Sequence, residues 1–300
     1  MKLYHPGDLP WDETQAIYHT LAQTGQEGLV VCRPSSRCVC LGLHDDLEQE
    51  VDEDYCRENN IPLIRREIGG GVVLLDSGQI FFQLVLSRDN PLLNGNRNRF
   101  FARFLQPAVA TLADFQIEAS ISPPADIVVN GRKISGNGAG DISGMAVYTG
   151  NILLSFDRRT MAGVLNLPDA RFRELMKLSL ERFLTTMGEE VSGPPDPSFV
   201  ENQLISHFAT WLGEMEPACY TEEMKRKTKA VAVTLTDREF LELPGKRSPM
   251  RQIKINENTY LRFRPIHGTN VEAPRYTIQL LQNGVIHDLE PSENSVAQNS

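Results

Sequence analysis

The chain has 300 residues, of which 41% are hydrophobic and 23% charged, with 30 basic and 39 acidic side chains. This is the composition of an ordinary folded protein, and the length suits about two domains. A net charge of -9 argues against a protein that neutralises many phosphates of a nucleic acid. We therefore expect no nucleic acid partner.

The cysteines and the N-terminus indicate a reducing compartment. The five cysteines are odd in number, and four of them lie in the first 56 residues without the even framework of a small secreted domain. The first residues, MKLYHPGDLPWDE, lack the apolar run of a signal peptide, and no segment approaches the ~18 uncharged apolar residues of a membrane span. The sequence predicts a cytoplasmic protein without a membrane partner.

The first 215 residues alternate helix patterns with short apolar runs. A helix is expected after Pro10, because acidic residues occupy its first turn and Ile17 and Leu21 lie four residues apart. A loop and helix are expected at 45–59, and further helices at 100–115, 169–187 and 196–212. Strands are expected at 28–32, 37–41, 61–65, 72–76 and 79–87, and a strand pair at 145–156.

Turn residues separate several of these runs. Pro34-Ser35-Ser36 lies between 28–32 and 37–41, which predicts a hairpin. Asn130-Gly131 lies between the strand-like runs 127–129 and 132–135. Because Asn-Gly tolerates the positive φ angles of a type I′ turn, it predicts a second hairpin. A tight turn is expected at 76–78.

The pattern changes beyond about residue 216. The basic run 225–229 could meet a nucleic acid or an acidic protein, but a solvated helix face is the favoured interpretation. We place a boundary here, between a domain of residues 1–215 and a small β-rich domain of residues 216–300, with a disordered tail in the last ten residues. Its strands are expected at 231–235, 252–255, 259–263 and 276–281, with a turn at Asn283-Gly284.

The stretch Arg65-Arg66-Glu67-Ile68-Gly69-Gly70-Gly71 is the most informative one. Consecutive glycines cost backbone entropy, so they indicate a backbone that something approaches closely. Successive N–H groups without side chains can form a nest for phosphate, and adjacent arginines can add charge-assisted contacts. The alternative is a glycine-rich hairpin loop with two solvated arginines.

A second glycine-rich stretch, residues 126–140, carries Lys133 at the exit of the expected hairpin. Its glycines do not form a dinucleotide fingerprint, because Asp141 stands where the last glycine is required and no amphipathic helix follows. A Walker phosphate loop does not fit either. The Lys133 ammonium could face a phosphate or a developing oxyanion, and the alternative is a surface lysine beside a glycine loop.

Cysteine chemistry finds little support in the sequence. Cys38 and Cys40 share one face of a strand, and the expected hairpin would place Cys32 across from them, but zinc fingers use spacings such as C-x2-C on turns. A buried strand explains these thiols more simply. No motif pairs a histidine with a cysteine, and His44 is the only histidine expected near the glycine loop.

Two motifs taken together resemble the signatures of the lipoate-protein ligase family. They are RREIGGGVVLLDSG at 65–78 and NGRKISG at 130–136. The resemblance extends from the Leu-Gly-Leu-His44 segment to Phe156, and more loosely over residues 1 to about 215. It implies the fold shared with biotin ligases and octanoyltransferases. This is an α/β fold of the α+β type, with mixed and antiparallel sheets flanked by helices, followed here by a small C-terminal domain that closes over the adenylate.

The family reaction implies ATP, Mg²⁺ and lipoate as ligands. Lipoate attacks the α-phosphate of Mg-ATP, and a lysine of a lipoyl-carrier domain then takes the acyl group from the adenylate. The resemblance implies that Lys133 is the catalytic residue, an electrostatic clamp on the acyl carbonyl and α-phosphate oxygens, and that Asp126 holds Mg²⁺ or the carrier lysine. The residues expected to bind ATP and lipoate are Arg66, Glu67, Gly69, Gly70, Gly71, Val72, Val73, Leu74, Leu75, Lys133, Ser135 and Gly136.

The chain departs from the family pattern at two places. Leu75-Asp76 replaces a His-Asp pair, and Tyr148-Thr149-Gly150 replaces His-His-Gly. These changes leave open the choice among lipoate, octanoate and biotin, and a non-catalytic binding homologue is one alternative. A cysteine-dependent octanoyl or lipoyl transferase is another, for which Cys219 is the only cysteine after Lys133.

The charge balance adds one expectation. Lipoyl-carrier domains tend to be acidic, and this chain is acidic as well. We therefore expect positive charge to concentrate around Arg65, Arg66, Arg132 and Lys133.

Overall fold

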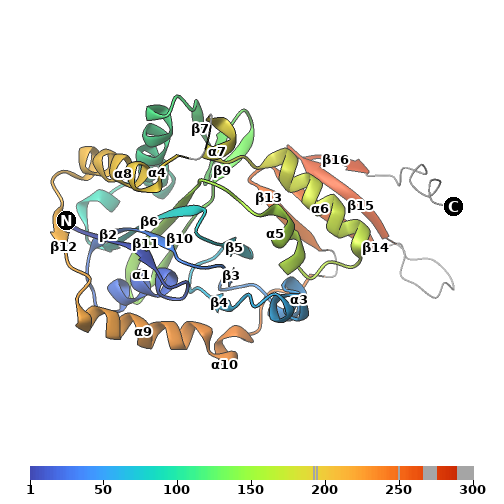
Figure 1. Ribbon diagram of the computed structural model, residues 1–300, viewed down its shortest axis with the longest axis horizontal. Helices are drawn as coiled ribbons and strands as arrows, with labels where there is room; N and C mark the ends of the chain where they lie inside the picture. Colours follow the sequence, from blue (N-terminus) through green and yellow to red (C-terminus); the bar gives the residue numbers. More distant parts are fainter. Residues whose placement is uncertain (192, 194, 249–250, 266–275, 289–300) are drawn as a thin grey trace.

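The computed structural model describes residues 1–191, 193, 195–248, 251–265 and 276–288 (Figure 1). None of the helices within these ranges combines the length and the apolar character that crossing a membrane requires. The disordered tail predicted for the last ten residues lies outside the described part of the chain.

A six-stranded mixed sheet forms the centre of the molecule. Its order is β10-β11-β6-β2-β1-β12, in which β1 pairs in parallel with β2 and β12 and the other neighbours are antiparallel. The strands are β1 (Lys2–Leu9), β2 (Gly28–Pro34), β6 (Gln79–Ser87), β10 (Asn137–Ile142), β11 (Met145–Leu153) and β12 (Glu216–Ala218).

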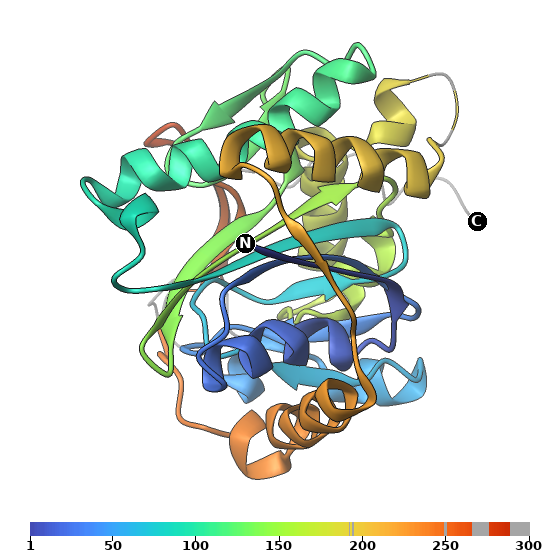
Figure 2. The same ribbon diagram turned by 90° about the vertical axis from the view of Figure 1, so that its left-hand side faces the viewer.

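Helices cover both faces of this sheet (Figure 2). Ile17, Leu21 and Val231 belong to the core on one face, and Phe104 and Phe208 belong to the core on the other. The first face is covered by α1 (Glu13–Gln23) and α9 (Glu222–Thr236), the second by α4 (Arg97–Asp114) and α8 (Pro197–Leu212). Asp196 caps α8 by accepting the N–H of Ser198, as its position before an apolar helical stripe predicts.

Two three-stranded sheets carry the motifs. One has the order β4-β3-β5 and the other β7-β8-β9. The strands are β3 (Cys38–Leu41), β4 (Leu63–Arg65), β5 (Val73–Leu75), β7 (Ala119–Ser122), β8 (Asp126–Val129) and β9 (Arg132–Ser135). Asn130 and Gly131 have φ angles of 50° and 77°, which confirms the hairpin predicted between β8 and β9.

A four-stranded antiparallel sheet lies at the C-terminal end of the described chain. Ile253, Leu261 and Ile278 of this sheet join the core that contains Phe172 and Met176 of α6. Its strands are β13 (Gln252–Asn256), β14 (Thr259–Pro265), β15 (Tyr276–Gln282) and β16 (Val285–Asp288), in that order. The helices not yet named are α2 (Leu47–Glu50), α3 (Glu53–Glu58), the 3-10 helix η1 (Pro91–Leu93), α5 (Arg158–Val164), α6 (Ala170–Phe183), α7 (Met187–Glu190) and α10 (Arg238–Leu241).

Three predicted elements are wrong. The runs 28–32 and 37–41 do not form a hairpin, because β1 and β6 occupy both edges of β2 and the chain crosses at Pro34 into the sheet of β3. The predicted pair at 145–156 is the single strand β11, whose partner β10 lies in the glycine-rich stretch. The predicted strand at 231–235 is part of α9, where buried residues at 228, 231, 232 and 235 follow helical spacing.

The basic run 225–229 lies on α9, as the solvated-helix interpretation predicts. Lys225 and Lys227 pair with Glu222 and Glu223 of the same helix. Residues just beyond 216 remain close to the first part of the chain, since β12 pairs with β1 and α9 contacts α1. The domain boundary at residue 216 remains a proposal. The four-stranded C-terminal sheet begins later in the chain, at Gln252.

Candidate active site

The glycine loop, residues Gly69–Gly71, connects β4 to β5 and is held from inside the protein by Arg66. The Arg66 guanidinium donates to the carbonyl oxygens of Gly69 at 3.2 Å, Gly71 at 2.9 Å and Cys40 at 3.2 Å. Its side chain is buried, so in this structure Arg66 shapes the loop and does not present its charge to solvent. Gly70 has a φ of +107°, a conformation that side chains disfavour, which explains a glycine at this position.

Arg65 has a different task from its neighbour. Its buried guanidinium donates to the carbonyl oxygens of Gly42 at 3.1 Å and Asp45 at 2.8 Å, and also to that of Leu241 in α10. The segment 42–45 in turn borders the glycine loop, because Leu43 N–H donates to the carbonyl of Ile68 at 3.0 Å. Arg65 therefore ties α10 to the segment beside the loop.

The buried His19 side chain binds the segment just before the glycine loop, a role that the sequence did not indicate. Its Nδ1 lies 2.6 Å from the carbonyl oxygen of Gln15, and its Nε2 accepts the backbone N–H of Glu67 at 3.1 Å. The ring is therefore the neutral tautomer with the proton on Nδ1, and burial lowers the pKa of His19 to about 4. The expectation that His44 is the only histidine near the loop is wrong, since His19 contacts Glu67, two residues before the loop.

The loop lies against β10 of the main sheet. A β-carbon at Gly138 would lie 3.8 Å from Cδ1 of Ile68 and 3.9 Å from the Gly69 carbonyl oxygen, and one at Gly140 would lie 2.8 Å from Cγ2 of Ile68. The glycines of the second motif thus permit this close approach, and they do not bind a dinucleotide by the expected fingerprint. Packing on β10 brings the first motif next to the second.

Lys133 lies on β9, just before the point where the chain turns into β10. Its Cε would lie 3.2 Å from a β-carbon at Gly136, so the lysine side chain packs over that glycine. Its Nζ lies 2.9 Å from Oδ1 of Asp126, a residue that is almost fully buried. The two residues face each other from the paired strands β8 and β9, so the Asn130-Gly131 hairpin creates the ion pair.

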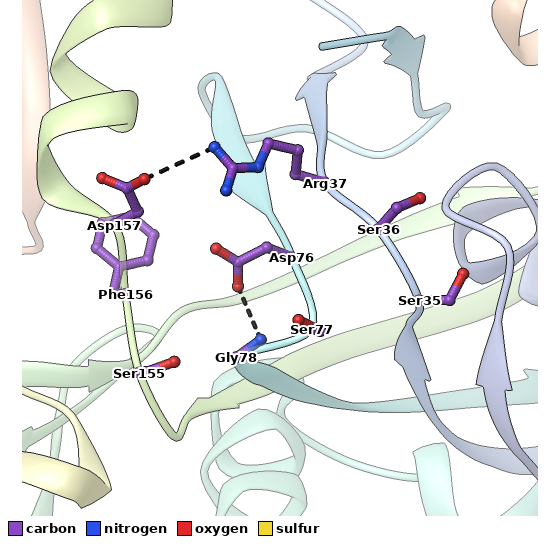
Figure 3. Close-up of a pocket in the computed structure, with 9 residues that line it drawn as sticks. All are labelled: Ser35, Ser36, Arg37, Asp76, Ser77, Gly78, Ser155, Phe156 and Asp157. Carbon is purple, nitrogen blue, oxygen red and sulfur yellow. Dashed lines mark hydrogen bonds and ion pairs between the residues drawn. The ribbon is translucent and has the colours of Figure 1, made fainter. Parts of the chain in front are cut away.

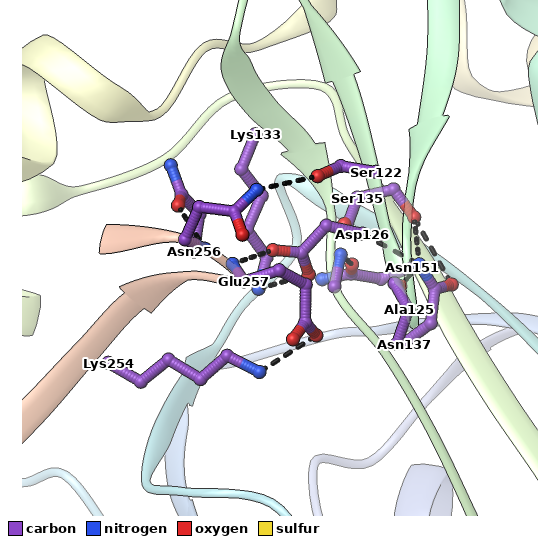
Figure 4. A network of polar contacts seen from close by, with 12 residues as sticks. Ser122, Ala125, Asp126, Lys133, Ser135, Asn137, Asn151, Lys254, Asn256 and Glu257 are labelled. Carbon is purple, nitrogen blue, oxygen red and sulfur yellow. Dashed lines mark hydrogen bonds and ion pairs between the residues drawn. The ribbon is translucent and has the colours of Figure 1, made fainter. Parts of the chain in front are cut away.

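The C-terminal sheet reaches this ion pair (Figure 4). The backbone N–H of Glu257, in the turn between β13 and β14, donates to Oδ2 of Asp126 at 2.7 Å. The Glu257 carboxylate pairs with Lys254 at 2.7 Å, and Asn258 Nδ2 donates to Ser122 Oγ at 3.3 Å. The accessory sheet therefore contacts the predicted site through the carboxylate that holds Lys133.

The predicted binding residues divide into an inner and an outer set. Arg66, Leu74, Leu75 and Ser135 are buried, and Ser135 Oγ lies 3.2 Å from Oδ1 of Asn137. The outer set, which solvent reaches at least in part, comprises Glu67, Gly69, Gly70, Gly71, Val72, Val73, Lys133 and Gly136. Solvent therefore reaches the glycine loop and Lys133, and their role in binding a ligand stays a prediction.

Each of the four cations expected to form a basic patch has a partner within the protein. Arg65 and Arg66 are buried against carbonyl oxygens, Arg132 pairs with Glu190 at 2.6 Å, and Lys133 pairs with Asp126. Burial makes unpaired charge expensive, so each cation has acquired a partner. The expected concentration of positive charge around these four residues therefore stays a prediction, with each cation paired in the structure.

Within the described ranges of the chain, no three His, Cys, Asp or Glu side chains lie close enough together to hold a metal ion. Both oxygens of Asp126 are already engaged by Lys133 and Glu257. Mg²⁺ in nucleotide sites commonly binds through substrate phosphates and only one or two carboxylates. These residues alone do not fit a resident Mg²⁺, and Asp126 as its ligand remains a prediction.

The buried cysteines are poor nucleophiles and poor ligands. Burial raises the pKa of the Cys32, Cys38 and Cys40 thiols, so all three stay protonated near neutral pH. Cys40 Sγ lies 3.4 Å from the Arg66 guanidinium, where it fills space beside the glycine loop. The interpretation as thiols of a buried strand fits this environment.

A cavity of about 560 Å³ lies at the opposite end of β3 and β5 from the glycine loop (Figure 3). Arg37, Asp76, Asp157 and serines of three connecting segments line it. Arg37 lies 3.7 Å from the Asp157 carboxylate, and Asp76 Oδ1 accepts the N–H of Gly78 at 2.9 Å. The cavity does not contain the glycine loop or Lys133, so it is separate from the predicted site.

Residues 9–209 match the family model of the lipoyl protein ligase A/B catalytic domain. The chain belongs to this family. Lipoate-protein ligase A subunit 1 of Thermoplasma acidophilum is 28% identical over 214 residues, which cover 68% of this chain and 78% of that protein. Lipoate-protein ligase 1 of Staphylococcus aureus is 25% identical over 216 residues, covering 72% of this chain and 59% of that protein. Lipoate-protein ligase LplJ of Bacillus subtilis is 35% identical over 99 residues, but the match covers only 28% of its length.

Solved structures share the fold of this chain. One is described as a bi-partite lipoate protein ligase of T. acidophilum with its E2 lipoyl domain, and it has a TM-score of 0.72 at 23% identity, covering 82% of this chain and 98% of that chain. Another is P. falciparum LipL1 in complex with lipoate, with a TM-score of 0.66 at 15% identity, covering 94% and 84%. The predicted α+β fold and the resemblance to lipoate-protein ligases are both confirmed.

Proposed function

We propose that this protein is an ATP-dependent lipoate-protein ligase. It would form lipoyl-adenylate and transfer the lipoyl group to a lysine of a lipoyl-carrier domain. The observation that carries the proposal is the approach of the glycine loop to the strand that follows the Lys133 turn, where Gly69 and Ile68 lie against Gly138. Two motifs about sixty residues apart in sequence therefore meet in a chain whose catalytic domain matches this family.

The ligands are inferred from relatives of similar fold. One similar structure is described as lipoate-protein ligase A bound with ATP, and another as a putative lipoate protein ligase of T. acidophilum with bound lipoic acid. Their folds match this chain with TM-scores of 0.65 and 0.64. ATP and lipoate as substrates, and a lipoyl domain as acceptor, belong to the proposal for this chain.

The geometry fits a chemistry of positioning and charge stabilisation. In the first step a carboxylate oxygen bonds to the α-phosphorus of ATP and pyrophosphate leaves. In the second, a carrier amine bonds to the acyl carbonyl and AMP leaves. Charge builds on phosphoryl and carbonyl oxygens in both steps, and Lys133 with the backbone N–H groups of Gly70 and Gly71 would stabilise it. Asp126 would orient the Lys133 ammonium.

The position of Cys219 speaks against the transferase alternative. Cys219 directly follows β12, at one edge of the main sheet, and the Lys133 turn leads into β10 at the other edge. At about 4.8 Å per strand spacing, these edges lie about 24 Å apart. A thioester on Cys219 would form far from the glycine loop and Lys133.

Exchange of labelled pyrophosphate into ATP tests the proposal. Lipoate, octanoate and biotin are offered in turn, and we expect exchange that depends on lipoate. Lys133→Ala should reduce it about 100-fold to 1000-fold, as for a lost oxyanion donor. Arg132→Ala is the matched control, because this adjacent cation pairs with Glu190 and not with Asp126.

Two results would contradict the proposal. Undiminished exchange in Lys133→Ala would remove the lysine from the chemistry. Binding of lipoate or ATP by the unmodified protein without any exchange would instead favour the non-catalytic binding homologue, for which Leu75 and Thr149 at the family histidine positions are the motivation.

A further inference from the structure

We infer that Gln79 and Asn151 form an amide bridge that fixes the strand of the glycine loop relative to the Lys133 turn. We treat both as positioning residues, because Gln79 is fully buried and the Asn151 amide is engaged by Gln79 and Gly136. The inference deepens the proposed function and rests on it, because it explains how two separate motifs keep the spacing that one adenylate requires.

The bridge is a continuous chain of three hydrogen bonds. Gln79 Nε2 donates to the carbonyl oxygen of Leu74 at 2.9 Å, and Asn151 Nδ2 donates to Gln79 Oε1 at 2.8 Å. Gly136 N–H then donates to Asn151 Oδ1 at 2.7 Å. Leu74 lies on β5, which continues directly from the glycine loop, and Gly136 is the residue over which Lys133 packs.

The ends of the chain fix the orientation of both amides. Gly136 offers a donor, so Asn151 must turn its oxygen towards Gly136 and its NH₂ towards Gln79. Leu74 offers an acceptor, so Gln79 must turn its NH₂ towards Leu74 and its oxygen towards Asn151. A flip of either amide would oppose donor to donor and acceptor to acceptor, so the bridge has one arrangement.

The main sheet places the two amides within reach of each other. In the antiparallel pairing of β6 and β11, Gln79 is opposite Leu153 and Asn151 is opposite Phe81. Gln79 and Asn151 are therefore diagonal neighbours, whose side chains share a face of the sheet. Asn151 also donates its own backbone N–H to the carbonyl oxygen of Gly136 at 3.2 Å, so two hydrogen bonds join these residues.

The bridge matters because the motifs have no common element of secondary structure. The glycine loop belongs to the sheet of β3, β4 and β5, and Lys133 belongs to the sheet of β7, β8 and β9. Catalytic groups need placement to within about 0.5 Å, and an error of about 1 Å can cost about 100-fold in rate. A buried amide chain anchored in the central sheet supplies a rigid spacer between the two sheets.

Near-isosteric carboxylates break single links of the bridge. Asn151→Asp keeps the acceptor for Gly136 N–H but loses the donor to Gln79. Gln79→Glu keeps the acceptor for Asn151 but loses the donor to Leu74 and to the Asp76 carboxylate. Gln83→Glu is the matched control. Gln83 lies on the same strand, is nearly as buried, and donates through Nε2 to the Thr14 carbonyl of α1 at 2.9 Å, so it takes no part in the bridge.

Hydrogen exchange at Gly136 provides a readout that needs no activity. We expect Gln79→Glu, which frees the Asn151 amide from its anchor at Leu74, to raise the exchange rate of the Gly136 amide about tenfold beyond any change in global stability. Asn151→Ser, which withdraws the acceptor from Gly136 N–H, should raise it as much, whereas Asn151→Asp keeps that acceptor and is compared by its activity. The kcat/KM for lipoate-dependent pyrophosphate exchange should fall about 10-fold to 100-fold in each. The double variant should be no worse than the poorer single variant, because one cut already breaks the chain.

The control separates bridging from general stability. Gln83→Glu should lower the melting temperature to a similar degree, yet leave Gly136 exchange and kcat/KM close to the unmodified protein. Effects that merely follow melting temperature in all three variants, or that add in the double variant, would overturn the bridge. Should a carboxylate variant not fold, Asn151→Ser shortens the reach to Gln79 without adding charge and is read in the same way.

The two proposals fail separately. If the unmodified protein exchanges no pyrophosphate, the proposed function is wrong, while Gly136 protection still tests the bridge. If the unmodified protein is active and the bridge variants behave like Gln83→Glu, the bridge alone is wrong.

Discussion

Lys133 and Asp126 form an ion pair at 2.9 Å, and the same carboxylate accepts the backbone N–H of Glu257 at 2.7 Å. Asp126 is nearly fully buried, whereas Lys133 remains partly open to solvent. One buried carboxylate thus holds both the proposed catalytic lysine and the turn of the C-terminal sheet. The position of Lys133 is consequently coupled to that sheet.

Asp126→Asn should weaken this coupling without removing the lysine. The amide oxygen can still accept from Glu257, but Lys133 loses its charged partner and its fixed orientation. We expect kcat/KM for pyrophosphate exchange to fall about tenfold, less than in Lys133→Ala, and stability to fall by about 1–3 kcal/mol. Asp141→Asn, which affects the more exposed pair with Arg88, serves as the control. A rate equal to that of the unmodified protein would show that Asp126 does not orient Lys133.

Gly42 is predicted to be essential for the shape of the glycine loop. A β-carbon at Gly42 would lie 2.0 Å from the carbonyl oxygen of Gly70, so the loop would have to move. We expect Gly42→Ala to destabilise the protein by about 1–3 kcal/mol, measured by urea unfolding. Gly69→Ala is the stability control, since a β-carbon there meets no atom within 4 Å. Equal stability of the two variants would contradict the packing described here.

The sequence predicted local elements better than the connections between them. The Asn130-Gly131 hairpin, the Asp196 cap and the glycine loop each depend on a few neighbouring residues, and each lies where local patterns place it. Pairing of β2 and β3 depended instead on which strands fill the edges of β2, and no local signal carries that information. The strand prediction for 231–235 was wrong because the two valines and the threonine of this segment favour strands, whereas the helical spacing of buried residues in α9 decides the outcome.

The residues that hold the site gave no signal in the sequence. His19, Gln79 and Asn151 belong to no recognisable motif, and the partners of His19 and Asn151 lie far along the chain. Arg66 was predicted to face an anion. The sequence alone does not decide this, because an arginine beside glycines can lie on either side of a loop. Its buried bonds to Gly69 and Gly71 became visible only with the fold.

The buried His19 should make stability fall as the solution becomes acidic. Its pKa is lowered from 6.5 to about 4 in the folded protein. Between these values the unfolded chain binds a proton that the folded chain does not, so stability present above pH 6.5 is lost as pH falls towards 4. The full shift corresponds to about 3 kcal/mol. Free energies of unfolding at several pH values should show a smaller loss in His19→Gln, and equal slopes would contradict the assignment.

Two substitutions of His19 separate its two hydrogen bonds. Gln places an acceptor near Nε2 and can keep the bond to Glu67 N–H, whereas Asn places a polar group near Nδ1 and can keep only the bond to Gln15. We expect His19→Asn to lower kcat/KM for pyrophosphate exchange about tenfold more than His19→Gln, because only the Glu67 bond positions the loop. The reverse order would assign His19 to the stability of α1 alone.

The most direct test of the account is the intact mass of a purified lipoyl-carrier domain after incubation with this protein, lipoate and ATP. We predict that the carrier gains one lipoyl group on its acceptor lysine, that the gain requires ATP, that it is lost in Lys133→Ala, and that Cys219→Ser retains it. No gain in the presence of ATP, or a gain without ATP that disappears in Cys219→Ser, would contradict the account.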